Sequence, residues 1–505
     1  MFLNANSVSI SLFVLGCLCF TPITQAQPAM KPNTIVTTDG EIDDVDSFIR
    51  MLLYANEFHL DGLIYSSSQW HYKGDGAGTS FVSELEMTKN IYGSRTELRW
   101  PGTQWMDTLL DAYQQVYPML SQNASGYPTA DHLRSLIRVG NIDFEGEMEK
   151  ETPGSRFIQE RLMNDNPEPI YLQVWGGTNT IARALKSIQE QYGHTDQWET
   201  VYRKVCAKTI LYMILDQDAT YNKYIAPNWP DIRVLYNTNQ FWTFAYFWKR
   251  TVPPSLHHYL EGRFMGESII KGHGPLLAHY YSYGDGQKQA GDPEHIHGDP
   301  AHLKDGQWGS FEKYDFISEG DSPSYLHLID VGLDNLEHPE YGGWGGRLAT
   351  SPEHPRRWED GDSVADWNPY TQQEDKSFPQ TRWIPAIQED FAARAEWCIK
   401  PYKEANHAPL VRLKGHASRT ASPGDKIQAR IKTKDPDGDV LQIRFWQYRE
   451  AGTYPQEIHL TSQGKKVHFK IPDTADRGTI HILAEVKDGS SHPMTRYARL
   501  VVNVQ

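Results

Sequence analysis

Short apolar runs and helical patterns alternate along most of the chain, between about residues 30 and 400. The apolar runs lie at residues 35–36, 60–66, 170–175, 210–215 and 232–236. The first is followed by apolar residues at helical spacing from Val45 to Leu53, and the third by a similar pattern from Thr178 to Ile188. This alternation predicts an α/β domain over residues 30–400, in which helices cover the faces of a sheet.

The pattern changes to a period of two after a break at residues 401–409. Alternating apolar positions then occur in three groups: Ile427, Ala429 and Ile431; Val467, Phe469 and Ile471; and Ile480, Ile482, Ala484 and Val486. They predict a small all-β sandwich over residues 408–505, similar to immunoglobulin-like modules but without their Cys…Trp…Cys hallmark. The acidic stretch 435–439 between these groups is explained by a tight turn as well as by a calcium site.

The first 26 residues have the character of an export signal. Residues 8–20 are mostly apolar, and Thr24-Gln25-Ala26 resembles a small-residue cleavage site. We therefore expect a periplasmic or secreted protein without a membrane span, because the apolar stretch is too short for one. Residues 14–17 loosely resemble a lipoprotein cleavage box, so lipid anchoring is a lesser alternative. Removal of the signal leaves Cys206 and Cys398, which either pair or stay as thiols.

Charge and aromatic content narrow the choice of partner. The chain of 505 residues has a formal net charge of -15 and no long basic run. Nucleic-acid binding needs a clustered positive surface, so we expect no such partner. Aromatic residues make up 12% of the chain and include 15 Trp. Their flat apolar faces and polar edges suit a carbohydrate cleft, although a large core uses the same residues.

Four carboxylates lie within six residues, between the first predicted strand and the helix after it: Asp39, Glu41, Asp43 and Asp44. Like charges this close repel one another, and the turn needs something to relieve that repulsion. A hard cation bound by oxygen ligands would relieve it. Capping of the helix by Asp43 or Asp44 is the alternative, since acids in a first turn suit the helix dipole. Four acids exceed what capping needs, so a functional site is favoured.

Two further segments suit the same kind of site, because ligands of open α/β sheets bind outside the carboxyl ends of strands. Residues 175–179, Trp-Gly-Gly-Thr-Asn, follow a predicted strand. Their glycines let the backbone approach a ligand, and Thr178 or Asn179 can cap the next helix. Residues 319–323, Glu-Gly-Asp-Ser-Pro, precede an apolar run, and a lone Asp321 there would be read as a helix cap.

A third stretch, residues 283–310, is rich in Gly, Asp, His and Pro, which is typical of a long loop. Its His295, His297 and His302 raise the question of a zinc site. No Cys accompanies them and their spacing fits no common ligand pattern, so a solvated loop is favoured.

The acidic turn, the Gly-Gly turn and the late aspartate, in this order, resemble the nucleoside hydrolase superfamily. That family opens with a strand followed by D-x-D-x-G-x-D-D, and residues 37–44 here read T-T-D-G-E-I-D-D. The resemblance implies an open, mostly parallel sheet with flanking helices. It also implies a Ca²⁺ ion held by Asp39, Asp44, Asp321 and the main-chain carbonyl of Trp175. Asp39 would also be the catalytic base, and Asp43 would bind a sugar hydroxyl.

Several positions depart from the family's pattern. Thr37 replaces its first acid, Glu41 its motif glycine, and Gly320 the histidine that helps a nucleobase leave. The substrate-facing residues are expected to be Asp43, Glu41, Gln69 (in place of an asparagine), the adjacent Trp70, and Asn222 (in place of a sugar-binding asparagine). The resemblance therefore implies a calcium- and sugar-facing part that is kept and a base-facing part that is rebuilt.

A closer resemblance covers nearly the whole mature chain. It rests on residues 38–44, residues 319–324, Arg382-Trp383-Ile384-Pro385, residues 390–394 and the β-sandwich region. These segments are similar to an exported bacterial "cellulose-binding protein" family, which has an N-terminal nucleoside hydrolase-like domain. The family's name implies a link to plant or algal polysaccharide and does not itself establish an activity.

Three hypotheses for the function follow. The first is an exported, calcium-dependent glycoside hydrolase that acts on poly- or oligosaccharides by water attack with inversion. Glu41, His71 and His273 are its candidate leaving-group acids. The second is a non-catalytic carbohydrate-binding protein, which the loss of the first acid and the late histidine favours. The third is a nucleoside hydrolase, against which export and Gly320 count.

Overall fold

The computed structural model describes residues 31–505 apart from 292–296, 305–307, 363, 455 and 475–476. The predicted export signal, the lipoprotein-like box and His295 lie outside the described residues. None of the helices in the described part of the chain is long and apolar enough to span a membrane.

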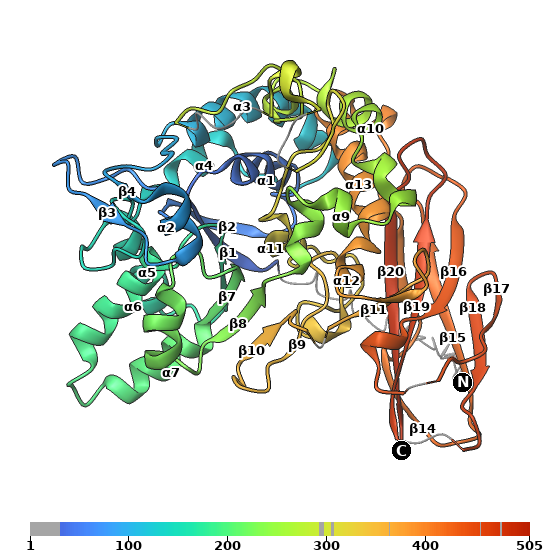
Figure 1. Cartoon of the computed structure of the whole chain (residues 1–505). Helices are drawn as coiled ribbons and strands as arrows, with labels where there is room; N and C mark the ends of the chain where they lie inside the picture. Colours follow the sequence, from blue (N-terminus) through green and yellow to red (C-terminus); the bar gives the residue numbers. More distant parts are fainter. Residues whose placement is uncertain (1–30, 292–296, 305–307, 363, 455, 475–476) are drawn as a thin grey trace, which may run out of the picture. The chain divides into compact units, whose positions relative to one another are not determined.

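An eight-stranded sheet forms the centre of the first domain, in the order β5-β2-β1-β6-β7-β8-β10-β9 (Figure 1). All neighbouring pairs are parallel except β9 with β10. The strands are β1 (Asn33–Thr38), β2 (His59–Tyr65), β5 (Ile137–Val139), β6 (Ile170–Val174), β7 (Thr209–Ile214), β8 (Arg233–Asn237), β9 (Ala349–Thr350) and β10 (Arg357–Glu359). The open, mostly parallel α/β fold is confirmed, and each predicted apolar run lies on a strand. The strands β5, β9 and β10 escape prediction because they are at most three residues long.

The helices follow the strands in the alternation that the sequence predicts. Their bounds are α1 (Ile42–Leu53), α2 (Glu86–Tyr92), α3 (Trp105–Asn123), α4 (Ala130–Ser135), α5 (Pro153–Met163), α6 (Asn179–Tyr192), α7 (Trp198–Lys208), α8 (Ala226–Asn228), α9 (Trp248–Thr251), α10 (Gly262–Phe264), α11 (Ser322–Leu326), α12 (Phe378–Thr381) and α13 (Ile384–Trp397). Successive strand residues point to opposite faces of the sheet. Accordingly, Val36 packs in one core with α1, α3 and α13, and Ile35 packs in another with α5, α6 and α7.

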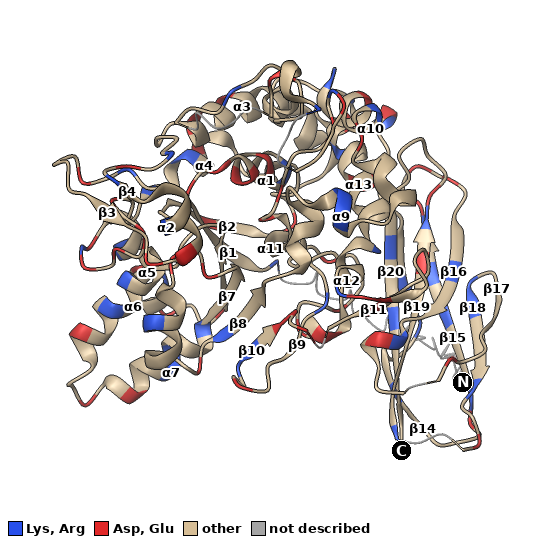
Figure 2. Cartoon of the chain, viewed as in Figure 1, with Lys and Arg blue, Asp and Glu red and all other residues tan. Residues whose placement is uncertain are grey.

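The direction of the chain across the sheet reverses between β1 and β6. From β1 the chain moves outward through β2 to β5, and from β6 it moves the other way through β7 and β8 to β10. Thr37 of β1 therefore lies opposite Ile64 of β2 on one side and Val174 of β6 on the other. Ligands bind at such a switch point, outside the carboxyl ends of the strands. The acidic start of α1 lies directly after β1 (Figure 2).

The C-terminal region forms two four-stranded sheets, β13-β15-β18-β17 and β14-β20-β19-β16. Their strands are β13 (Leu410–Leu413), β14 (Ser418–Ala421), β15 (Lys426–Lys434), β16 (Gln442–Gln447), β17 (Thr461–Gln463), β18 (Lys466–Lys470), β19 (Gly478–Lys487) and β20 (Thr495–Val504). The alternating apolar residues point inward as predicted, for example Val467, Phe469 and Ile471 of the β18 region. At the acidic turn, Asp435 Oδ1 accepts hydrogen bonds from three successive backbone N–H groups, which is the tight-turn arrangement.

The two regions pack against each other within one compact unit from Pro32 to Gln505. Arg496 of β20 donates to Asp390 of α13 across 2.7 Å. Tyr448, just after β16, donates to Asp366 across 2.7 Å. The sandwich is therefore joined to the first domain by buried polar contacts as well as by apolar packing. The two cysteines left open by the sequence, Cys206 and Cys398, are free and buried in separate cores.

Candidate functional site

The acidic turn lies at the carboxyl end of β1, where Gly40 has a φ of 80° that a side chain would disfavour. The Thr38 hydroxyl donates to Asp44 Oδ1 and accepts from the backbone N–H of Gly40. Helix α1 begins after Glu41, whose side chain makes no capping hydrogen bond. Asp43 and Asp44 lie inside the first helical turn and not at the capping position. Capping therefore does not account for these carboxylates.

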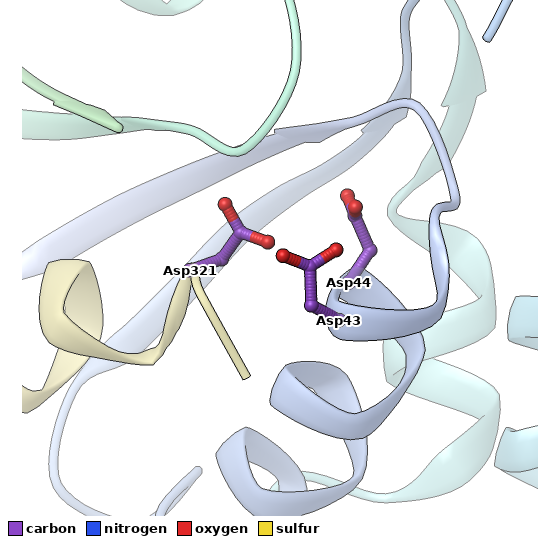
Figure 3. Close-up of side chains that lie close together, drawn as sticks. All are labelled: Asp43, Asp44 and Asp321. Atoms are coloured by element: carbon purple, nitrogen blue, oxygen red, sulfur yellow. The ribbon is translucent and has the colours of Figure 1, made fainter. Parts of the chain in front are cut away.

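Three carboxylates converge at this turn: Asp43, Asp44 and Asp321. One oxygen from each lies within 4.8 Å of the others, and Figure 3 shows Asp321 facing the two helical aspartates from a separate segment. Asp321 precedes α11 without capping it by its side chain. The spacing suits a Ca²⁺ ion, which takes oxygen ligands at about 2.3–2.6 Å. The donor set is all oxygen, so the residues present fit this metal.

The pKa shifts of the three carboxyl groups also indicate a cation site. Burial raises the pKa of Asp43 well above its usual value, and the charges of Glu41 and Asp39 raise it further. Burial likewise raises the pKa of Asp44 and of Asp321, with the neighbouring aspartates adding to the effect. Without a counter-charge, ionising all three groups together is unfavourable, because they are buried and their charges repel one another. A divalent cation would allow all three to ionise.

Asp39 is not a member of this group of three, although the sequence resemblance makes it a ligand. Its Oδ2 atom is buried, lies 3.5 Å from His71 Nδ1, and has no hydrogen-bond partner among the described residues. Burial alone would raise the pKa of Asp39, but the nearby His71 ring, together with Ser68 and Asp44, outweighs burial and holds this pKa below its usual value. Asp39 thus differs from the three aspartates, whose pKa values are raised.

Glu41 points into the same site. Its Oε2 atom lies 4.0 Å from His71 Nδ1, and its Oε1 atom accepts a hydrogen bond of 3.0 Å from the Tyr246 hydroxyl. The side chain of Glu41 is 17% exposed, whereas those of Asp39 and His71 are each 1% exposed. Glu41 is therefore the more accessible of the two carboxylates beside His71.

Gly320 packs directly against Asp43. A Cβ atom at position 320 would lie 2.6 Å from Asp43 Oδ2, which is far inside the van der Waals limit. The histidine expected here from the family's pattern could not fit without moving Asp43. The glycine thus leaves room for the Asp43 carboxylate in the group of three aspartates.

Replacing Gly320 by Ala is expected to displace the Asp43 carboxylate, because the end of a side chain can move where the backbone cannot. Calcium binding should then weaken about tenfold, because one of the three carboxylate ligands is displaced. The free energy of unfolding should fall by no more than about 1–3 kcal/mol relative to the unmodified protein. Isothermal titration with Ca²⁺ measures the affinity. Gly361→Ala is the matched control, because a Cβ atom there meets nothing within 4 Å. Equal calcium affinity in the two variants would contradict this role of Gly320.

The carbonyl of Trp175, predicted as a calcium ligand, accepts a hydrogen bond of 2.8 Å from Gln217 Nε2. The two glycines after it allow close approach, but to other side chains of this chain. A Cβ at Gly176 would lie 3.0 Å from the Asp39 side chain, and a Cβ at Gly177 would lie 2.3 Å from Asp218 Oδ2. Gly176 therefore lets β6 pack against the acidic turn after β1.

The remaining predicted substrate-binding residues differ in their burial and in their contacts. Gln69 is buried and accepts a hydrogen bond of 2.6 Å from the Thr88 hydroxyl, and Trp70 packs edge-on against Tyr92. Asn222 is exposed, and its amide donates to Asp216 across 2.8 Å. No described contact brings the Asn222 side chain to the three aspartates.

Of the candidate histidines, His71 lies at the acidic site and His273 does not. His71 reaches the acidic turn as described above. The charges that act on His273 come from Glu396, His492 and Lys400, and burial lowers its pKa. These groups lie outside the acidic site, so the structure gives His273 no part in it. In the long loop, His297 packs against the Tyr246 ring at 5.9 Å, and His302 lies 3.9 Å from Asp299.

Several polar residues that contact the predicted ones are not themselves predicted from the sequence. Asp218 accepts from the backbone N–H of Asn179 and so takes the capping role expected of Thr178 or Asn179. Asp216, in the same turn after β7, has its pKa raised to about 7 by burial and by the charge of Asp218. The signal was available, since Asp-Gln-Asp follows an apolar strand just as the acidic turn follows β1. Tyr246 carries no such signal, because its partner Glu41 is 205 positions away.

Comparisons with known proteins show the family to which the chain belongs. Residues 33–348 match the model of the family described as cellulose-binding Sde182, nucleoside hydrolase-like domain. Residues 427–504 match the C-terminal domain of cellulose-binding protein Sde0182. A comparison with curated proteins found no match.

Solved structures give a further similarity. The chain is 25% identical to a nucleoside hydrolase-related protein from Saccharophagus degradans that is associated with carbohydrate metabolism. The alignment covers 94% of this chain and 100% of that one, with a TM-score of 0.68. A plant nucleoside hydrolase, PpNRh1, is 10% identical over 73% of this chain and 98% of its own, with a TM-score of 0.27. By its family match over most of the first domain, the chain belongs to the family of cellulose-binding Sde182 proteins with a nucleoside hydrolase-like domain.

Proposed function

We propose that this protein is an exported, calcium-dependent glycoside hydrolase that cleaves plant or algal poly- or oligosaccharides at the acidic site. The observation that carries the proposal is the pair Asp39 and His71, 3.5 Å apart, in which a buried carboxylate is held ionised beside a group of three aspartates. A base must be ionised and within reach of its proton to work. The family's cellulose-binding description supports the choice of substrate class.

In this proposal Asp43, Asp44 and Asp321 would hold the ion, and Asp39 lies beside them. Bound calcium would supply positive charge that orders a water and the sugar's vicinal hydroxyls, with only a modest effect on the water's pKa. Because the acidification is modest, the chain itself must supply the base. Asp39 takes the proton of the attacking water, and His71 keeps the Asp39 carboxylate charged.

The leaving group needs an acid on its own side of the sugar. Glu41 is the proposed donor, because it is the more exposed of the carboxylates beside His71 and the Tyr246 hydroxyl fixes one of its oxygens. Attack by water from the Asp39 side and departure on the Glu41 side would invert the anomeric centre.

A second candidate function is non-catalytic carbohydrate binding. It is favoured by the Trp175 carbonyl, which already accepts a hydrogen bond from Gln217 and so has one lone pair fewer for a metal. Gly320 favours either carbohydrate function over nucleoside hydrolysis, because it offers no side chain to a nucleobase.

Hydrolysis of a glycan panel in the presence of Ca²⁺ tests these alternatives. The proposal expects reducing sugar to be released from at least one β-linked glucan and no free base to be released from nucleosides. Binding of a glycan without release of reducing sugar from any glycan would establish the second candidate instead. Release of free base from nucleosides would point to the third, a nucleoside hydrolase.

Calcium is expected to stabilise the fold as well as to support activity. At a Ca²⁺ concentration a hundred times the Kd, the free energy of unfolding should rise by about 2.7 kcal/mol, and a chelator should reverse the gain. Asp321→Asn should abolish this gain, because it removes the ligand that comes from outside α1. Asp439→Asn, in the acidic turn of the sandwich, is the control and should keep it. If Asp439→Asn loses the stabilisation by calcium and Asp321→Asn keeps it, the calcium site lies in the sandwich and not at the acidic turn.

A further inference from the structure

A cavity lies away from the acidic site, where the sandwich meets the first domain. It has a volume of 1060 Å³. One wall comes from strands β16, β19 and β20 of the sandwich (Figure 1). The other comes from α12, the start of α13 and a hairpin of two short strands, β11 (Asp366–Asn368) and β12 (Gln373–Asp375). We refer to this space as the interdomain cleft. Its size is slightly above that of typical ligand sites, which hold about 300–1,000 Å³.

Aromatic rings line the cleft from both walls. Trp367 of β11 is 41% exposed and Tyr370, in the hairpin loop, is 51% exposed, which is unusual for residues of this size. Trp446 of β16 lines the opposite wall. Trp and Tyr present a flat apolar face together with a polar edge, and this suits a ligand with apolar faces and hydroxyl edges.

Two of these rings pack against neighbouring aromatic rings, and the backbone of the third is tied to the sandwich. Trp446 donates its indole N–H to Glu485 Oε2 across 3.2 Å and packs against Trp383, with ring centroids 6.2 Å apart. Tyr370 meets Phe378 edge-on at 6.2 Å. The backbone N–H of Trp367 donates to Glu450 of the sandwich across 3.1 Å. A pre-organised surface of this kind loses little conformational entropy when a ligand binds.

Polar groups stand beside the rings. Arg382 lies 3.3 Å from Asp366, and its guanidinium stacks 4.3 Å from the centre of the Tyr448 ring. Its Nε atom is buried and has no hydrogen-bond partner among the described residues, although buried donors are normally paired.

The charges around the cleft balance. The lining contains four basic residues, Arg382, Arg444, Arg449 and Lys487, and four acidic ones, Glu374, Glu450, Glu457 and Glu485. Figure 2 shows both signs on the elements of the two walls. A phosphate-rich ligand would require a positive excess, and a cationic ligand a negative one. Balanced charge with flat aromatic faces matches a neutral, hydroxyl-rich chain.

We propose that the interdomain cleft is a glycan-binding site, in which a neutral β-linked glucan chain stacks on Trp367, Tyr370 and Trp446. The sandwich is then one wall of a binding site as well as a neighbour of the first domain. The choice of a glucan rests on the proposed function of the acidic site, whereas the cleft itself does not depend on that site being catalytic.

Isothermal titration of the full chain with cellohexaose, and pull-down on swollen cellulose, test the proposal. Trp367→Ala and Tyr370→Ala should each weaken binding about tenfold, because each removes one stacking face. Both residues are largely exposed, so the fold should survive, and circular dichroism checks that it does. Tyr402→Ala is the matched control, since Tyr402 is 42% exposed and does not line the cleft. The control should bind like the unmodified protein.

Other outcomes decide against the cleft. The proposal is overturned if the unmodified chain binds neither probe, or if the double variant of Trp367 and Tyr370 binds both probes as tightly as the Tyr402 variant. Asp39→Asn separates the two sites, because it should leave cellohexaose binding at the cleft unchanged whatever its effect on hydrolysis. Glycan that the unmodified protein binds but never hydrolyses would show that the proposed function has failed, whereas hydrolysis by a protein whose binding does not depend on Trp367 and Tyr370 would show that the cleft proposal has failed.

Discussion

Replacing Arg50 by Met is expected to lower the free energy of unfolding by about 3–5 kcal/mol, the usual cost of removing one partner from a buried ion pair. Arg50 of α1 and Glu319 have side chains with no exposed surface, and they form two hydrogen bonds, of 2.6 and 2.8 Å. The guanidinium also donates to Gln388 of α13 and stacks 3.9 Å from the centre of the Phe391 ring. Without it, the Glu319 carboxylate would remain buried without its counter-charge. Urea unfolding followed by circular dichroism measures the change.

A matched control is available on the surface. Arg134 pairs with three aspartates within 3.2 Å, but its side chain is 33% exposed. Arg134→Met should therefore cost less than about 1 kcal/mol. The double variant Arg50→Met with Glu319→Leu should recover part of the loss, because the unpaired charge is then gone. A single-variant loss no larger than that of Arg134→Met would show that this pair does not hold the two segments together.

The Arg50–Glu319 pair has a consequence for the acidic site. Glu319 comes two residues before Asp321, and Arg50 follows Asp43 and Asp44 on the same helix. The pair thus fastens the segment that carries one aspartate to the helix that carries the other two. Calcium affinity should fall in Arg50→Met even where the protein remains folded, because the three oxygens would no longer be held at one place.

The parts of the site that are local in the sequence are the parts that could be predicted. Asp39 to Asp44 form a dense acidic run directly after a strand, and the carboxyl end of a strand is where such a run acts. The late aspartate, Asp321, could be added only because three separate segments appear in the order of a known superfamily. No spacing rule links Asp321 to Asp43, since their meeting depends on the packing of α11 against α1.

Long-range partners are the parts that could not be predicted. Arg50 and Glu319 are 269 positions apart, and Gln217 and Trp175 are 42 apart. Arg50 and Gln217 have ordinary local contexts, as a helix arginine and a turn glutamine, so nothing in the sequence pairs them with Glu319 and Trp175. The choice of helix caps fails for the same reason. Thr178 is a good capping residue by type, but Asp218 of a neighbouring turn supplies the acceptor.

The fold could be predicted better than the site, because the spacing of apolar residues along the sequence indicates which faces of a helix or strand are buried. Ile35 and Val36 are adjacent and face opposite cores, as a strand buried on both faces requires. The interdomain cleft had no counterpart in the sequence. Trp367 and Trp446 belong to different domains and are indistinguishable by pattern from core aromatics until exposure is known.

Replacing Asp39 by Asn is expected to reduce kcat on any glycan that the unmodified protein hydrolyses by about 10²–10⁴-fold, the usual contribution of a general base. Asn has nearly the same shape and cannot accept the proton. Asp46→Asn is the matched control, since Asp46 is a buried carboxyl on the same helix, burial raises its pKa, and it lies outside the group of three aspartates. The control should keep both kcat and thermal stability. An Asp39→Asn variant that hydrolyses glycan as fast as Asp46→Asn would remove Asp39 from the mechanism, and its contact with His71 would then be structural.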